Sequence, residues 1–444
     1  MTIMSDFDLL VRGSEQDIAI AHEKFVAIGT NLKGTAREEI DATNLSIFPG
    51  VIDSHLHFNE PGRTEWEGFS TGSRAAAAGG TTTVFDMPLN AHPPTIDGPS
   101  FDQKRVAAEK TSHVDFALWG GLVPGNLKEL KTLRDRGVVG LKAFMCNSGI
   151  DDFPHVDDAT LRDGMHSAAE LGLLVAVHAE SEEITQRLTR EKKSAGKTAI
   201  GDYLESRPVE AELDAIGRAI QFAHETGCRL HIVHISCGSG VQLVAAAREK
   251  GIDVTCETCP HYLLLTKADL PNIGPTAKCA PPLRSIDEQD DLWRRLDDVT
   301  TIGSDHSPSP FEMKKRANFF DVWGGISGCQ HLLPLLVDAA QKSQRSLSQK
   351  QIANLTSRNV AKRFGLAGKG GIEIGKDADL TLVDTAASDL VAPESLHYRH
   401  RHSPYVGRKL SNRIVRTILR GRTIFERGKF ATKPEGRFVR PDRV

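Results

Sequence analysis

Short apolar runs alternate with amphipathic stretches through the middle of the chain. Eight such runs, rich in β-branched residues, are FPGVIDSH, TTTVFDM, FALWGGLV, VGLKAFM, LLVAVHAE, LHIVHIS, DVTCETCP and TTIGSDHSP. Strands that alternate with helices indicate a parallel sheet, and eight of them predict an α/β fold of the (β/α)8 TIM-barrel type. The alternative is a doubly wound open sheet, but no glycine-rich GxGxxG turn follows the first run.

The stretch EAELDAIGRAIQFAHETG illustrates the helices expected between these strands. Its apolar side chains Leu213, Ile216, Ile220 and Ala223 fall on one face at helical spacing. Gly227 follows them and is a natural stop for the helix.

Both ends of the chain have a different pattern. Residues 6–48 and 372–430 contain short, alternating, strand-like segments, and the second range predicts a hairpin that turns at Arg420-Gly421-Arg422. Neither end is large enough to bury a good core alone. We therefore predict that residues 1–50 and 366–444 form one small composite β-sandwich domain, and that residues 51–365 form the barrel.

Composition and charge exclude several classes of protein. The 444 residues are 39% hydrophobic and 25% charged, which is ordinary for a soluble globular protein. A net charge of −3 leaves no basic surface of the kind that binds nucleic acid or an anionic membrane. We see no signal peptide and no apolar span of eighteen residues. The seven scattered cysteines suggest reduced thiols and a cytoplasmic location.

Polar side chains cluster at the ends of the predicted strands, where barrels of this type carry their chemistry. The first strand ends in His55-Leu56-His57, and side chains two apart on a strand share a face. Any one of these side chains alone is better explained as a hydrogen-bonded structural group. Together they predict a metal centre, because so many buried polar groups must be ligated or paired. The candidates are His55, His57, Lys142, His178, His234 and Asp305.

Strand parity separates neighbouring candidates. His231 and His234 face opposite ways, and His234 lies nearer the strand end, so we interpret His231 as structural. An ammonium cannot ligate a cation, so Lys142 is either a salt-bridge partner or a modified residue. A buried lysine loses its proton readily, and the free amine can react with carbon dioxide to form a carbamate.

At this point the sequence resembles the amidohydrolase superfamily, and within it the cyclic amidases, which include dihydroorotase, dihydropyrimidinase (hydantoinase) and allantoinase. The resemblance spans nearly the whole chain and rests on HLHFNEPGRTEWEGF, CETCPHYLLL, AKCAPPLR, SDHSP, WGGISG and SPYVGR. It implies two divalent metal ions per subunit, held by the six candidates, with Lys142 as N6-carboxylysine. It also implies a hydroxide shared by the metals and Asp305 as the catalytic proton carrier. Zinc suits these ligands best, and cobalt, manganese and iron also fit.

Among the cyclic amidases the quoted stretches are most similar to those of allantoinases, which implies hydrolysis of allantoin to allantoate. Dihydroorotase usually has an arginine at the position of Asn59 and a histidine at that of Ser309, and both serve the substrate carboxylate. A neutral substrate needs neither group. The alternatives are a hydantoinase or dihydropyrimidinase and, with less support, a catalytically dead scaffold. The resemblance further suggests a homotetramer and a substrate site that includes Asn90, Ser307 and Cys279.

Two other motifs have simpler interpretations. Cys256 and Cys259 form a CxxC without a second ligand pair, which favours packing over a zinc or redox site. The tract HYRHRHSPY holds His397, His400 and His402 among arginines that would repel a cation. We predict that this tract lies on the surface or at a subunit interface.

Overall fold

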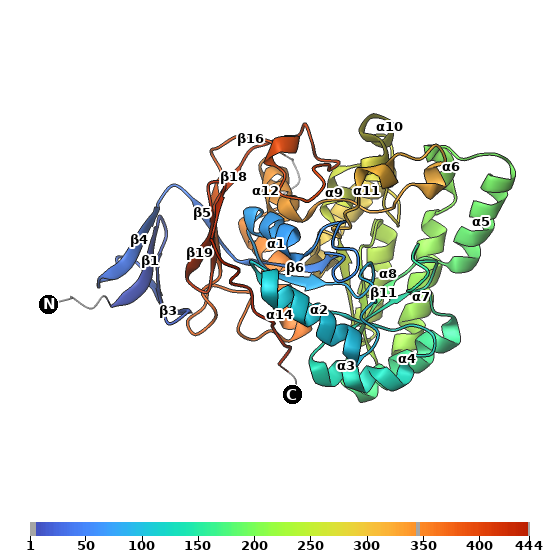
Figure 1. Cartoon of the computed structure of the whole chain (residues 1–444), viewed down its shortest axis with the longest axis horizontal. Coiled ribbons are helices and arrows are strands. Elements are labelled where there is room, and N and C mark those ends of the chain that lie inside the picture. The colour runs from blue at the N-terminus through green and yellow to red at the C-terminus, as the bar shows by residue number, and fades with distance from the viewer. Residues whose placement is uncertain (1–5, 343–346, 443–444) are drawn as a thin grey trace.

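The computed structural model describes residues 6–342 and 347–442, and its central feature is a parallel barrel (Figure 1). Each of the eight predicted runs supplies one barrel strand, the third run being divided between β8 and β9. The strands are β6 (Val51–Leu56), β7 (Thr81–Asp86), β8 (Asp115–Leu118), β9 (Gly120–Gly121), β10 (Leu141–Phe144), β11 (Leu174–His178), β12 (Arg229–Ile232), β13 (Val254–Thr258) and β14 (Thr301–Ile302).

Hydrogen bonds between neighbouring strands follow the chain order. Strands β6, β7 and β8 pair in parallel, and β9 to β14 pair in parallel in the same sequence. The ring closes beside the first strand, where the His57 amide donates to the His306 carbonyl at 2.7 Å. Strand ends from the whole barrel therefore meet at one mouth.

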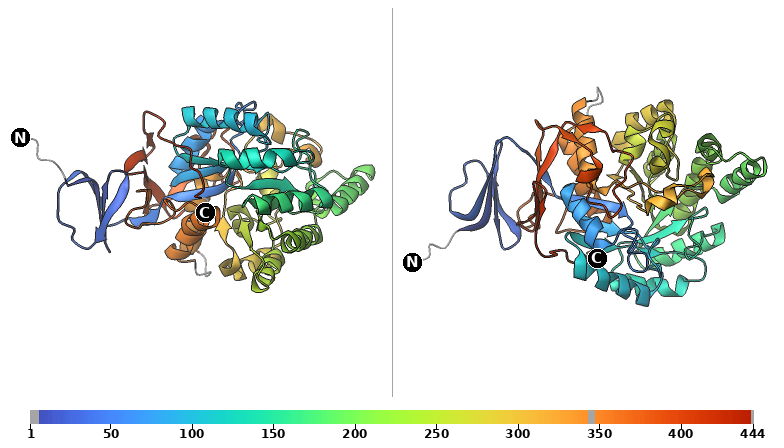
Figure 2. Two further views of the ribbon diagram at one scale, coloured as in Figure 1. Left: turned by 90° about the horizontal axis from the view of Figure 1, so that it is seen from below. Right: turned by 45° about the horizontal axis from the view of Figure 1, so that its top comes forward.

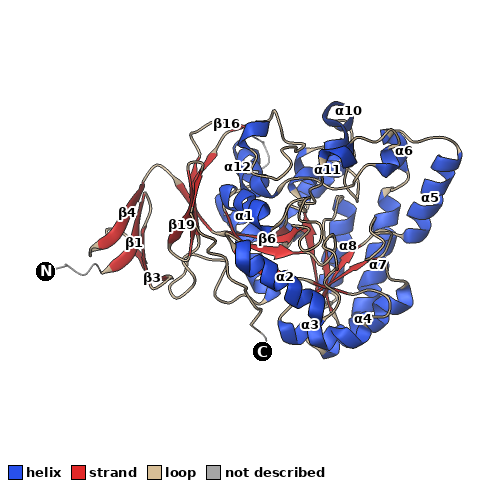
Figure 3. Cartoon of the chain, in the orientation of Figure 1, coloured by secondary structure: helices blue, strands red, loops and turns tan. Residues whose placement is uncertain are grey.

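Helices surround the strands on the outside of the barrel (Figures 2 and 3). They are α1 (Phe69–Ala78), α2 (Gly98–Thr111), α3 (Leu130–Arg136), α4 (Asp158–Glu170), α5 (Glu182–Ser194), α6 (Ile200–Glu205), α7 (Val209–Thr226), α8 (Gly238–Glu249), α9 (Pro260–Leu264), α10 (Leu270–Ile273), α11 (Ile286–Arg294), α12 (Leu332–Lys342), α13 (Gln349–Ala353) and α14 (Asn359–Phe364). No helix among the described residues is long and apolar enough to cross a membrane.

Helix α7 begins and ends close to the predicted limits, and Gly227 follows it with a φ of 68°. Its buried face differs slightly from the prediction. Ile216 and Ala223 are buried as expected, whereas Leu213 and Ile220 are only half-buried. The buried face of α7 also includes Ala211, Ala215 and Ala219, all fully buried.

The two chain ends form two facing sheets, drawn at the left of Figure 1. One sheet has the order β3-β2-β1-β4, and the other has the order β20-β19-β18-β15-β5. Their strands are β1 (Phe7–Gly13), β2 (Asp17–Ala21), β3 (Lys24–Gly29), β4 (Ala36–Ala42), β5 (Ser46–Pro49), β15 (Leu380–Asp384), β18 (Arg413–Leu419), β19 (Arg422–Glu426) and β20 (Lys429–Phe430). Residues from both ends share one apolar core, including Leu9, Ile18, Ile20, Leu380 and Ile418. The hairpin predicted around Gly421 joins β18 to β19.

A buried ionic cluster joins these sheets to the barrel. The Lys369 ammonium lies 2.6 Å from Asp115 on β8 and 2.7 Å from Asp379, and its side chain is 3% exposed. Arg420 in the hairpin turn also pairs with Asp115. Each buried ammonium, guanidinium or carboxylate group here lies beside an opposite charge. This pairing offsets the free-energy cost of removing the charges from water.

The histidine-rich tract packs against its own barrel, which refines the prediction of a surface segment. Between β16 (Asp389–Leu390) and β17 (Lys409–Leu410), the tract crosses the rim of the barrel mouth. His400 lies 2.8 Å from the Glu65 carbonyl, and His402 lies 2.8 Å from the Ser309 carbonyl. The Arg399 side chain donates to the Glu67 carbonyl at 2.6 Å. The tract therefore connects the loop after β6 to the loop after β14.

Candidate metal centre

The first half of the site is formed by His55 and His57 at the end of β6. Nδ1 of His55 lies 2.7 Å from the Glu257 carboxylate of β13, and Nδ1 of His57 lies 3.5 Å from the Leu89 carbonyl. Both Nε2 atoms instead face Asp305, at 3.3 Å and 3.7 Å. Each imidazole therefore uses one nitrogen for support and presents the other to the same point, as metal-ligating histidines do.

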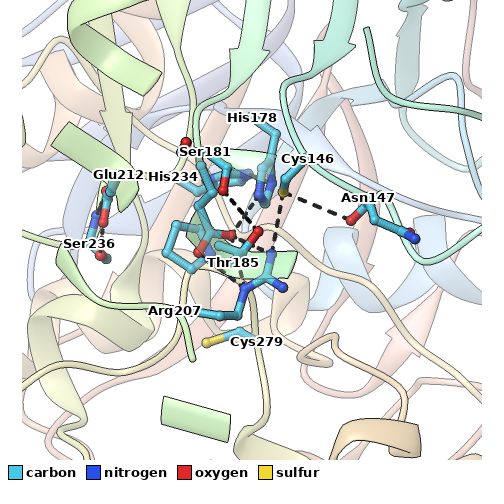
Figure 4. Close-up of polar contacts among 12 residues, drawn as sticks. Cys146, Asn147, His178, Ser181, Thr185, Arg207, Glu212, His234, Ser236 and Cys279 are labelled. Atoms are coloured by element: carbon cyan, nitrogen blue, oxygen red, sulfur yellow. Dashed lines mark hydrogen bonds and ion pairs between the residues drawn. The ribbon is translucent and has the colours of Figure 1, made fainter. Parts of the chain in front are cut away.

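The second half of the site is formed by His178 at the end of β11 and His234 just after β12. Nδ1 of His178 lies 3.0 Å from Nε2 of His234, so these two nitrogens also converge. The other nitrogen of His178 lies 2.8 Å from Glu180, which Arg207 holds in turn at 2.7 Å. Figure 4 shows both histidines with the guanidinium group of Arg207 below them.

Lys142 lies on β10, the strand that pairs with the His178 strand β11. Its side chain is fully buried, and Nζ has no hydrogen-bond partner among the described residues. Nζ lies 4.9 Å from the centre of the Phe144 ring, and that ring stacks on His178 at 4.6 Å. Burial lowers the pKa of Lys142 to about 7, although the charges of Asp305 and Glu257 act in the opposite direction. An unpartnered buried amine is a polar group that the protein alone leaves unsatisfied.

The surroundings of these side chains favour the protonation states that can bind a metal ion. Burial lowers the pKa of His57, His178 and His234 below the usual histidine value. Burial raises the pKa of Asp305, but the neighbouring His55 and His57 outweigh it and lower that pKa overall. One ligand atom from each of His55, His57 and Asp305 lies within 4.8 Å of the others. Neutral imidazoles around an ionised carboxylate fit a divalent cation.

A cavity of about 830 Å³ opens at the barrel mouth beside these residues. Asn90, Ser307 and Cys279, the predicted substrate contacts, all line it. The Asn90 amide donates to the Ser307 hydroxyl at 3.3 Å, so these two side chains form one polar wall. Burial raises the pKa of Cys279 to about 12, so this residue presents a neutral thiol.

Asn59 and Ser309 are both buried, and neither lines the cavity. Asn59 donates to the Pro308 carbonyl at 3.3 Å. Neither residue therefore places a cation or a direct contact on the cavity wall.

The side chains of two further histidines near the strand ends do not contact the candidate ligands through a hydrogen bond among the described residues. His231 is buried, with Nδ1 2.8 Å from the Thr255 hydroxyl and its ring edge against Phe364 of α14. His306 turns away from Asp305 and packs against Tyr398, 5.0 Å between ring centres.

Sequence reasoning missed the residues that orient the ligands, namely Glu257, Glu180 and Arg207. Glu257 supports His55 from a position 202 residues further along the chain. A signal was present, since both glutamates lie at strand ends, in CETC and VHAE. Glu180 lies only two residues after His178, whereas the pairing of Glu257 with His55 depends on strand register and cannot be read from the chain order.

Comparison with known proteins places this geometry in a family. Residues 46–424 match the Amidohydrolase family. The chain belongs to the amidohydrolase family. It is 57% identical to an allantoinase of Rubrobacter xylanophilus over 99% of both chains. It is 54% identical to an allantoinase of Solibacter usitatus, covering 96% of this chain and 93% of the relative.

Solved structures of amidohydrolases confirm the fold. The L-hydantoinase (dihydropyrimidinase) of Arthrobacter aurescens superposes with a TM-score of 0.94 and 34% identity, covering 98% of this chain and all of that one. The dihydropyrimidinase of Brevibacillus agri superposes with a TM-score of 0.89 and 32% identity, covering 99% of both chains. The predicted barrel fold with an added sheet-rich domain is thus confirmed.

Proposed function

We propose that this amidohydrolase opens the hydantoin ring of allantoin to give allantoate. The observation that carries this proposal is the identity of 57% and 54%, over nearly the whole chain, to relatives named allantoinase. The cavity supports it, because polar groups without a dedicated carboxylate anchor suit a neutral cyclic ureide.

Two divalent metal ions fit the two histidine pairs. His55 and His57 would hold one ion, and His178 and His234 the other, with Asp305 beside the first pair. Lys142, carboxylated by carbon dioxide, would contribute a carbamate to both ions, which accounts for its buried and unpartnered Nζ. Zinc is the ion we propose. Such ions polarise an amide carbonyl and acidify water.

Asp305 is the side chain that we propose for proton transfer. Asp305 accepts a proton from the attacking water as the new C–O bond forms at the ring carbonyl carbon. It returns that proton to the ring nitrogen as the C–N bond breaks, so that the nitrogen leaves as the neutral NH2 of a ureido group. Asn90 and Ser307 orient the ring through hydrogen bonds, and the Cys279 thiol packs beside it.

A hydantoinase is the second candidate, favoured by the TM-score of 0.94 to the Arthrobacter aurescens enzyme. One assay separates the two. Metal-loaded protein is given allantoin, hydantoin, dihydrouracil and dihydroorotate side by side. We expect the highest kcat/KM for allantoin and the lowest for dihydroorotate. A higher kcat/KM for hydantoin or dihydrouracil would favour the second candidate, and a preference for dihydroorotate would refute both.

We further propose that the enzyme is a homotetramer that works in the cytoplasm. All seven cysteines are buried and free, which suits a reducing compartment. Sedimentation of the purified protein tests the tetramer, and a monomer at micromolar concentration would refute it.

A further inference from the structure

Residues 310–325, which we call the wall segment, follow β14 and form one side of the cavity. Two short 3-10 helices lie in it, η4 (Phe311–Lys314) and η5 (Phe319–Asp321). Cavity-lining residues of this segment include Met313, Phe320, Val322 and Trp323. Regular secondary structure covers little of the wall segment, so other contacts must fix its position.

Lys278 makes one set of these contacts from the loop after α10. Its side chain is buried, and Nζ donates to the carbonyl oxygens of Phe319 at 2.7 Å, Phe320 at 3.0 Å and Val322 at 2.6 Å. Nζ also lies 4.5 Å from the centre of the Tyr203 ring on α6. All three hydrogen bonds of this Nζ thus go to the wall segment.

Lys314 makes the second set from within the wall segment. Its Nζ donates to the carbonyls of Trp323 at 2.9 Å and Gly325 at 2.6 Å, and its side chain is buried. The Trp323 indole in turn donates to the Ser307 carbonyl at 3.2 Å. At Gly325 the backbone passes so near to Ser307 that a Cβ atom would lie 2.3 Å from its carbonyl oxygen. This end of the segment is therefore held against the strand end that carries Asp305.

Lys278 and Lys314 are unusual because no described carboxylate forms an ion pair with either Nζ, and burial lowers the pKa of each to about 7. The charged form of each therefore depends on its hydrogen-bond acceptors. A buried charge without a counter-charge is expensive unless hydrogen bonds replace the lost water. Here five backbone carbonyls do so, and all belong to the wall segment. If the wall segment moved outward, both ammonium groups would lose their acceptors. The charges and the segment position therefore stabilise each other.

We propose that Lys278 and Lys314 are positioning residues that fix the wall segment and thereby set substrate affinity. The inference rests on the proposed function in taking the cavity as the substrate site. Lys314 does not line the cavity, so its effect must pass through the segment. Neither lysine touches the candidate metal ligands through any described hydrogen bond, so the chemical step itself should be spared.

The test compares Lys314→Met and Lys278→Met with Lys315→Met in the metal-loaded enzyme. Lys315 is the matched control, since it lies in the same segment but is exposed, with Nζ 4.6 Å from the Phe311 ring. We expect KM for allantoin to rise about tenfold in Lys314→Met, with kcat changed by less than about threefold. Lys278→Met should give at least as large a rise, and Lys315→Met should match the unaltered enzyme.

Limited proteolysis supplies a readout that does not depend on the substrate. Chymotrypsin cleaves after Phe and Trp, so the lysine substitutions leave its sites in the segment intact. We expect faster cleavage within residues 310–325 in Lys314→Met and Lys278→Met, at unchanged metal content. Lys314→Gln keeps hydrogen-bond donors at this position but removes the charge. It replaces Lys314→Met in both measurements if that variant does not fold.

Three results have distinct meanings. Unchanged KM and unchanged cleavage in a folded Lys314 variant would overturn the positioning role while leaving the proposed function intact. An enzyme that does not hydrolyse allantoin would overturn the proposed function. The rates of chymotrypsin cleavage would still test whether the two lysines fix the wall segment. A fall in kcat without a change in KM would also contradict the proposal, because it would place Lys314 in the chemical step.

Discussion

At the scale of single residues, His55 and His178 are each fixed through the nitrogen that does not face the centre. Glu257 supports His55 and Glu180 supports His178, each within 2.8 Å. Such support sets the tautomer and presents a lone pair to the ion. The same logic makes Lys142 informative, because its Nζ has no support among the described residues.

Lys142→Ala should abolish most activity, since it removes the atom on which the carbamate would form. Acetate or propionate added with divalent metal should restore part of it by entering the space left beside the ions. Rescue should be incomplete, because an untethered acid loses translational freedom on binding. Rates measured against acid concentration check this. A flat response, together with an unmodified lysine in native, metal-loaded enzyme, would contradict the carbamate.

The six central residues were predictable because each lies at the end of an apolar run, and strand ends of a barrel meet. Parity then separated His234 from His231. Glu257 and Arg207 were not predictable, because their roles depend on which strands are neighbours. The same limit applies to Lys278, whose partners lie some forty residues along the chain in a segment without periodicity.

At the scale of elements, the hairpin between β18 and β19 positions the N-terminal sheet. Its turn residues Arg420 and Gly421 have φ of 47° and 75°. A Cβ on Gly421 would lie 2.8 Å from the Ile20 side chain on β2. The turn was predictable from its Arg-Gly-Arg sequence, whereas its contact with β2 was not, since 400 residues separate the two.

Gly421→Ala should therefore destabilise the fold in two ways. Left-handed backbone at a non-glycine residue costs roughly 1–2 kcal/mol, and crowding a packed core adds about 1–3 kcal/mol. Gly428→Ala is the matched control, because Gly428 has a φ of 85° but no atom within 4 Å of its Cβ position. Denaturant unfolding should show a larger loss for Gly421→Ala. Equal losses would mean that the Ile20 contact contributes nothing.

At the scale of the whole molecule, Lys369 compensates the acidic groups between barrel and sandwich. Lys369→Met should destabilise the protein by about 3–5 kcal/mol, because it leaves buried carboxylates unpaired. Lys376→Met removes a more exposed pair, 3.2 Å from Glu373, and should cost less than about 1 kcal/mol. Urea unfolding of both variants checks this. A loss for Lys369→Met no greater than that for the control would show that the cluster does not join the two parts.

Buried neutral histidines should make the fold sensitive to acid. Burial lowers the pKa of His231 to about 3 and those of His261 and His331 to about 4. The unfolded chain binds these protons near pH 6.5, so stability should fall as the pH drops from about 6.5 towards 4. Each histidine contributes up to about 1.4 kcal/mol per pH unit in that window. Unfolding of chelator-treated protein measures this without metal loss, and equal stability at pH 7.5 and 5 would contradict it.

The central claim is that two divalent ions at the barrel mouth enable this chain to hydrolyse allantoin. The most direct test removes metal with a chelator and returns zinc in steps, measuring bound metal and allantoin hydrolysis on the same samples. We predict negligible hydrolysis without metal and full activity as the content reaches two ions per chain. Hydrolysis that persists in metal-free protein, or that never appears at two ions per chain, would contradict the account.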